Sequence, residues 1–125
     1  MILIFILIYK QNIIIIYNNG GKKMLKMPNK IYISGGITDV PGYMEHFEKA
    51  EKLLTGYFSN RVVNPAKVLA KLPAGTSWQE YMDVSMEMLK TCNCIYMLDG
   101  WQESKGAKLE HSYAKDSNYE IYYES

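Results

Sequence analysis

Residues 92–98 read CNCIYML, an apolar run interrupted only by Asn93, and residues 99–100 read DG. A short apolar run that ends at turn residues is typical of a central parallel strand, because helices cover both faces of such a strand. The segment that follows, residues 105–116, reads KGAKLEHSYAKD and predicts a helix. A buried strand followed by a helix is the repeating unit of α/β proteins.

The same alternation extends toward both ends of the chain. A helix is predicted from Tyr43 to Gly56, and another begins after Thr76 or Ser77. Residues 66–77 are predicted to be a loop, with or without one helical turn before Pro73. Three further strands are predicted, at residues 30–34 (KIYIS), 61–64 (RVVN) and 119–123 (YEIYY). With right-handed crossovers, this order predicts a flavodoxin-like three-layer sandwich with a four- to five-stranded parallel sheet.

Composition and charge argue against several classes of function. The chain has 125 residues, 48% hydrophobic and 22% charged, the balance of a single globular domain. The formal net charge is +1 and Arg61 is the only arginine, so duplex nucleic acid is not an expected partner. Cys92 and Cys94 are too few to hold a structural zinc ion, and they imply no disulfide framework. We therefore expect no metal and a cytoplasmic location.

The first 23 residues differ from the rest. Residues 1–17 read MILIFILIYKQNIIIIY and suggest a membrane anchor, but a lysine at the centre of a span costs about 3 kcal/mol. In the next segment, NNGGKKM, the glycine codons can spell a ribosome-binding sequence just before an ATG. We expect residues 1–23 to be an upstream extension of the gene, with translation starting at Met24 or Met27 and 24–125 forming the domain. Alternatively, residues 1–23 are a short hydrophobic anchor or an ordered part of the fold.

The predicted helix after the central strand carries the main candidate for catalysis. Ala107, Glu110 and Ala114 are three and four positions apart, so they share one face. Glu110 is then a carboxylate on the inward side of a helix lined with small residues. Because an unpaired buried carboxylate is costly, such a group is normally partnered or used in function. The alternative is a partly exposed glutamate beside Lys105 or Lys108.

Further candidates lie at the predicted carboxyl ends of the strands, where parallel sheets bind their ligands. These ends contain Gly35, Gly36, Asn64 and Asp99. The two glycines either allow a ligand to approach the backbone or only form a turn. They do not belong to a G-x-G-x-x-G sequence, so the dinucleotide-binding fingerprint is absent.

The start of the helix after the central strand is a candidate anion site. Ser104 is the predicted N-cap, and Gly106 allows close approach of the backbone behind it. Free amides at a helix N-terminus attract anions, although simple capping explains the same pattern. Asp99 or Glu103 would supply a second carboxylate beside Glu110, as retaining glycosyl transfer requires.

Four segments in order resemble the DUF4406 family. They are KIYISGGIT from Lys30, VVNPA from Val62, W-x-x-Y-M from Trp78, and L-D-G-W-x-x-S-K-G-A-x-x-E-H-x-x-A from Leu98. That family resembles a branch of the nucleoside 2-deoxyribosyltransferase and deoxynucleotide N-hydrolase superfamily. The resemblance covers roughly residues 29–123. It implies a flavodoxin-like fold and cleavage of the N-glycosidic bond of a 2′-deoxynucleoside or its 5′-monophosphate.

The resemblance also implies roles for individual residues. Glu110 matches the glutamate that attacks C1′ and forms a glycosyl-enzyme intermediate, and Ser104 matches the serine that contacts a 5′-phosphate. Gly35 and Gly36 match glycines that line the sugar or base pocket. Asp99 is the candidate for protonating or orienting the base. Further substrate contacts are predicted from Asn64, Asp83, Ser85, Trp101 and Gly106.

The chain departs from the family pattern at four positions. Relatives have a proline where Gly36 stands and a proline where Asp99 stands. They have an aspartate where Asn93 stands and another where Ser85 stands, although Asp83 lies half a turn from Ser85. The loss of the aspartate at the position of Ser85 leaves two hypotheses open. One is an N-glycosidase or deoxyribosyltransferase-like enzyme, and the other is a non-catalytic nucleotide-binding or sensing module of the same fold.

Both hypotheses share their expected partners. The ligand is a small-molecule nucleoside or nucleotide, and neither hypothesis requires a metal or an organic cofactor. Relatives often complete their sites with a neighbouring subunit, so a homo-oligomer is expected. No membrane contact is expected unless residues 1–17 are translated.

Overall fold

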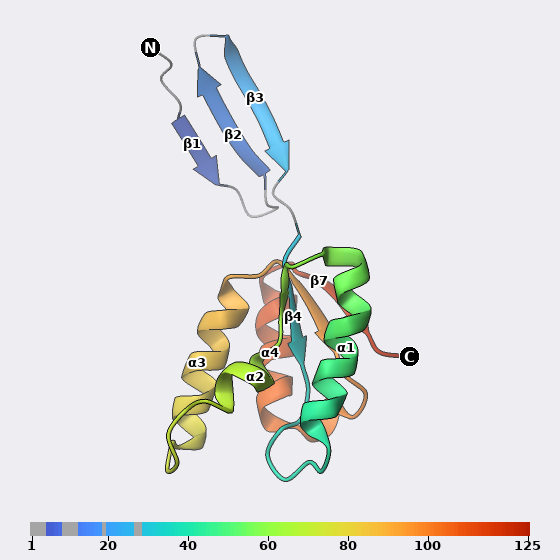
Figure 1. Cartoon of the computed structure of the whole chain (residues 1–125). Helices are drawn as coiled ribbons and strands as arrows, with labels where there is room; N and C mark the ends of the chain where they lie inside the picture. The colour runs from blue at the N-terminus through green and yellow to red at the C-terminus, as the bar shows by residue number, and fades with distance from the viewer. Residues whose placement is uncertain (1–4, 9–12, 19, 27–28) are drawn as a thin grey trace.

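The computed structural model of the chain describes residues 5–8, 13–18, 20–26 and 29–125 (Figure 1). The domain that carries the predicted site has four strands: β4 (Ile31–Ser34), β5 (Val62–Val63), β6 (Cys94–Met97) and β7 (Glu120–Tyr123). They form one sheet in the order β5-β4-β6-β7, and every pair is parallel. This arrangement confirms the predicted α/β fold of flavodoxin-like type, with four strands in the sheet.

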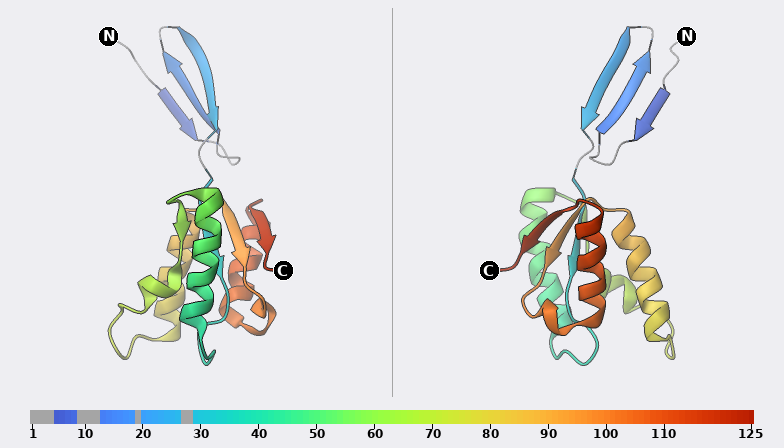
Figure 2. Two further views of the ribbon diagram at one scale, coloured as in Figure 1. Left: turned by 45° about the vertical axis from the view of Figure 1, so that its right-hand side comes forward. Right: turned by 180° about the vertical axis from the view of Figure 1, so that it is seen from behind.

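Four helices accompany this sheet. They are α1 (Tyr43–Phe58), α2 (Pro65–Leu69), α3 (Trp78–Lys90) and α4 (Lys105–Asp116). Helix α1 covers one face of the sheet, and α3 and α4 cover the other (Figure 2). The carboxyl ends of β4 and β6 and the first turns of α1, α3 and α4 lie at the same end of the domain (Figure 1).

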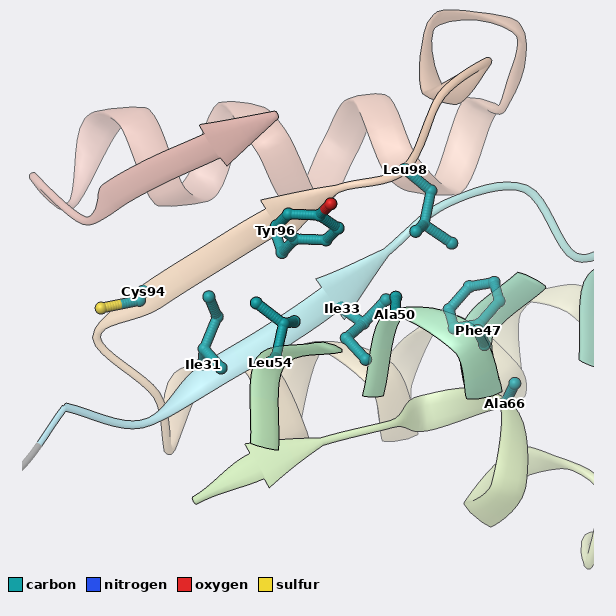
Figure 3. Packing of buried hydrophobic residues seen from close by; sticks show 9 residues of the cluster. All are labelled: Ile31, Ile33, Phe47, Ala50, Leu54, Ala66, Cys94, Tyr96 and Leu98. Atoms are coloured by element: carbon teal, nitrogen blue, oxygen red, sulfur yellow. The ribbon is translucent and has the colours of Figure 1, made fainter. Parts of the chain in front are cut away.

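The alternation of side chains along β4 divides the core into two clusters. Ile31 and Ile33 point to the α1 side, where they pack with Phe47, Ala50 and Leu54 (Figure 3). Tyr32 belongs to the opposite cluster, under α3 and α4. Because successive strand residues face opposite sides, Ser34 lies on the same face as Tyr32. All four residues of β4 are buried, as expected of a central parallel strand.

The N-terminal part of the chain forms a second, antiparallel sheet. Its strands are β1 (Phe5–Ile8), β2 (Ile13–Asn18) and β3 (Gly21–Lys26), which pair in the order β1-β2-β3. The upstream-extension hypothesis stays a prediction, because strand pairing does not test where translation starts. Met27, one of the two proposed start residues, lies outside the described residues. None of the helices in the described part of the chain combines the length and the apolar character needed to cross a membrane.

Two predicted boundaries differ from the structure. Helix α1 continues past Gly56 to Phe58, whose side chain packs against the buried cluster below α1, and the helix ends at Ser59. Helix α2 is the short helical turn that the sequence allowed before Pro73, but it begins at Pro65, where the Asn64 side chain accepts a hydrogen bond from the Ala66 amide (3.1 Å). By contrast, α4 spans the residues that the sequence predicts, 105–116.

Two glycine substitutions test how tightly this fold is packed. A Cβ atom on Gly35 would lie 2.8 Å from the buried Leu98 side chain, whereas one on Gly56 would meet nothing within 4 Å. We expect Gly35→Ala to destabilise the protein by about 1–3 kcal/mol through overpacking. Gly56→Ala should stabilise it by about 0.5–1 kcal/mol, because alanine is the better helix former. Urea denaturation measures the free energy of unfolding of both variants. A change of the same sign in Gly35→Ala and Gly56→Ala would contradict the packing described for these two glycines.

Candidate active site

A cavity of about 680 Å³ lies at the carboxyl end of β4. Its size is within the range of small-molecule sites. Both strand-end glycines contribute to its wall, as do the first turns of α3 and α4. Its lining includes Tyr32, Gly35, Gly36, Tyr43, Trp78, Tyr81, Met82, Ser85, Glu103, Ser104, Lys105, Gly106 and Glu110.

The carboxylate of Glu110 is buried in the wall of this cavity. Its side chain is only 5% exposed, and it shares the inward face of α4 with the buried Ala107 and Ala114. The Ser34 hydroxyl donates a hydrogen bond to Oε1 at 2.7 Å, and the Tyr32 hydroxyl donates to Oε2. Both oxygens therefore have a partner from β4, and these bonds hold the carboxylate in place in the cavity wall.

Burial changes the acidity of this group. Removal from water raises the pKa of Glu110 to about 7, although the hydrogen bonds from Tyr32 and Ser34 act to lower it. Burial, followed by the charge of Glu110, raises the pKa of Tyr32 well above its ordinary value. Tyr32 therefore keeps its proton at neutral pH and remains a donor to Glu110.

Ser85 extends this network on the side of α3. It is buried, and its side chain forms a hydrogen bond with Tyr32 that lowers the pKa of the phenol. Since the Tyr32 proton is donated to Glu110, the phenol oxygen is the acceptor from Ser85. The result is a chain of polar groups in which Ser85 contacts Tyr32, and Tyr32 and Ser34 both contact Glu110.

Sequence reasoning did not identify Tyr32 and Ser34 as site residues. The available signal was the alternation in KIYIS, which places these two polar side chains on one face of a buried strand. A hydroxyl on a strand that is buried on both faces needs a hydrogen-bond partner. The carboxylate of Glu110, which the spacing of residues 105–116 placed on an inward helix face, was a candidate for this partner.

Other predicted residues shape the cavity rather than its chemistry. A Cβ atom on Gly106 would lie 2.9 Å from the Met82 sulfur, so this glycine allows α3 and α4 to approach each other. A Cβ atom on Gly36 would lie 3.6 Å from the Ser104 Cβ. The Ser104 hydroxyl accepts a hydrogen bond from the Ala107 amide at 3.1 Å, as expected of the N-cap.

Four predicted residues do not line this cavity. Asp99 is exposed, and its backbone amide donates to Glu124. Asp83 is exposed and bonds to Gln79, and Asn64 caps α2. The indole of Trp101 stacks on His111, with ring centroids 4.3 Å apart. Glu103, the second candidate for the partner carboxylate, does line the cavity.

No metal centre accompanies these groups in the described ranges 5–8, 13–18, 20–26 and 29–125. Within them, no three side chains of His, Cys, Asp or Glu are grouped in a way that could hold a metal ion. The polar groups at the cavity are instead hydroxyls, carboxylates and one ammonium.

The cavity lies in a region of the chain that matches a known protein family. The profile described as "Domain of unknown function (DUF4406)" matches residues 29–123. The chain belongs to the DUF4406 family. The matched region includes the whole parallel sheet, all four helices and every residue of the cavity, so the site lies within the family domain. No curated protein and no solved structure matches the chain.

The raised pKa of Glu110 predicts a particular dependence of stability on pH. The folded protein holds this proton up to a pKa of about 7, against an ordinary value of 4.5 in the unfolded chain. The free energy of unfolding therefore falls as pH rises from about 4.5 to 7, by an amount on the order of 3 kcal/mol. Glu110→Gln removes this titrating group. The free energy of unfolding of the variant, relative to that of the parent, should therefore increase as the pH rises from about 4.5 to 7.

Urea unfolding at pH 5 and pH 8 measures this difference. Glu45→Gln, which removes an exposed carboxylate from the first turn of α1, is the matched control and should leave the pH dependence of the parent in place. A stability difference between Glu110→Gln and the parent that is equal at both pH values would show that Glu110 does not titrate as described.

Proposed function

We propose that this protein cleaves or transfers the N-glycosidic bond of 2′-deoxynucleosides or deoxynucleoside 5′-monophosphates, with Glu110 as the nucleophile. The observation that carries the proposal is the buried carboxylate of Glu110 in a cavity wall, oriented by Tyr32 and Ser34. The likeness of the S-x-G-x-x-x-E segment, Ser104 to Glu110, to the nucleoside 2-deoxyribosyltransferase-like superfamily supports the same chemistry.

In the first step, an oxygen of Glu110 attacks C1′ of the deoxyribose. The bond from C1′ to the base nitrogen breaks, its electron pair leaves with the base, and the base takes up a proton. Each oxygen of Glu110 accepts one hydrogen bond and keeps a second lone pair for this attack. Water, or a second base, then displaces Glu110 from C1′ and completes hydrolysis or transfer.

The proton for the departing base requires a second acid. Glu103 and Asp99 are both exposed, but only Glu103, just before α4, lines the cavity. We therefore assign this role to Glu103 in preference to Asp99. Ser104 would act on a 5′-phosphate, since its hydroxyl oxygen accepts from the Ala107 amide and its proton remains available to a ligand oxygen.

One observation favours a second candidate function, a nucleotide-binding or sensing module without catalysis. The buried position that is an aspartate in the family pattern is Ser85, and its hydroxyl contacts Tyr32. In a binding module, Glu110 would accept hydrogen bonds only from Tyr32 and Ser34 and would hold α4 against β4. Ligand affinity without release of base distinguishes this candidate from the enzyme.

Release of free base tests the proposed activity. The full chain is incubated with a panel of deoxynucleosides and their 5′-monophosphates, and chromatography measures the free bases. Glu110→Gln should lower the rate by about 10³-fold or more, since it removes the nucleophile at nearly constant volume. Because the ionised carboxylate is the nucleophile, the rate for the parent should rise with pH through about 7.

Glu45→Gln is again the matched control and should release base at the rate of the parent. Release that depends on the 5′-phosphate would identify a nucleotide hydrolase and support the role of Ser104. Release only when an acceptor base is added would identify a transferase. Binding of panel members without any release would contradict the enzyme and favour the binding module.

A further inference from the structure

Two residues at the cavity mouth form a contact that the proposed chemistry does not use. Trp78 is the first residue of α3, and Lys105 is the first residue of α4. Both line the cavity, and the Lys105 Nζ lies 4.4 Å from the centroid of the Trp78 ring. The contact therefore joins the two helices across the cavity that contains Glu110.

The surroundings of Trp78 favour a planar ligand. The cavity lining contains three partly exposed aromatic residues, Trp78, Tyr43 and Tyr81. The cavity mouth therefore offers a ligand aromatic ring faces with polar groups at their edges. Nucleobases stack on such faces, and stacking tolerates different bases because every base has a π-face. Within the described part of the chain, Lys105 forms no ion pair that would hold it over the indole.

We propose that Trp78 is the stacking surface for the substrate's nucleobase and that Lys105 covers this surface only in the empty site. The inference rests on the proposed function, because it takes the ligand to be a nucleoside or nucleotide. An exposed cation over an indole ring interacts with it more weakly than a stacked base does. Replacement of Lys105 by a nucleobase on the face of Trp78 is therefore favourable. Lys105 is the only Lys or Arg residue in the cavity lining, and it remains beside the ligand after the exchange.

The fluorescence of Trp78 reports this contact directly. The chain has two tryptophans, so Trp101→Phe leaves Trp78 as the single indole. Titration of Trp101→Phe with deoxynucleosides and their monophosphates should quench its fluorescence to saturation. In Trp78→Phe, which retains Trp101, the same titration should leave the fluorescence of the remaining indole unchanged.

Affinity measurements test the energetic part of the inference. In a Glu110→Gln background, which prevents turnover, Trp78→Leu should weaken binding by about 10- to 100-fold, and Trp78→Phe should retain most of the affinity. Lys105→Ala should tighten the binding of uncharged deoxynucleosides by about two- to fivefold, because it removes the competitor for the ring. Lys108→Ala, exposed on the same helix but outside the cavity, is the matched control and should change nothing.

The outcomes separate this inference from the proposed function. Base release by the parent with no quenching of Trp78, or undiminished affinity in Trp78→Leu, would overturn the stacking role and leave the N-glycosidic chemistry standing. Quenching of Trp78 by nucleotides without base release would support stacking and overturn the chemistry. The quenching experiment leaves Trp78 itself unchanged, so the test remains decisive even if Trp78→Leu fails to fold.

Discussion

The two hydrogen bonds from β4 to the Glu110 carboxylate are the interactions on which the site depends. A carboxylate that is 5% exposed is tolerated only when its oxygens have partners, and Tyr32 and Ser34 supply them from the central strand. Together with the buried Ala107 and Ala114, these bonds hold the inward face of α4 against the sheet. Burial raises the pKa of Glu110 to about 7, even though these two hydrogen bonds act to lower it.

Close packing at glycines shapes the cavity around this carboxylate. Gly35 allows the chain to pass against Leu98 at the end of the sheet, and Gly106 allows α4 to approach Met82 on α3. Because the strands are parallel, their carboxyl ends and the first turns of the helices meet at one end of the domain (Figure 1). Glu110, the N-cap Ser104 and the aromatic residues at the mouth therefore line one cavity.

Much of the fold was predictable because helix and strand periodicities are local. The spacing of Ala107, Glu110 and Ala114 identified the buried face of α4, and the alternation in KIYIS was available for β4. The predicted end of α1 was wrong, because a contact distant in sequence decides it. Gly56 does not end α1, because the next turn brings Phe58 onto the core. Asp99 was assigned to the site from its place after a strand, but its side chain lies outside the cavity.

The sequence by itself determined the α/β class and the alternation of strands and helices after residue 29, and it favoured an inward-facing Glu110, since each follows from patterns within a few residues. Only the tertiary structure decided which groups contact that carboxylate. Tyr32 and Ser34 are 78 and 76 positions away from Glu110, and the pairing of β4 with β6 brings them under α4. Residue spacing encodes the face on which a side chain lies, whereas its partner depends on which strands pair and how closely the helices pack.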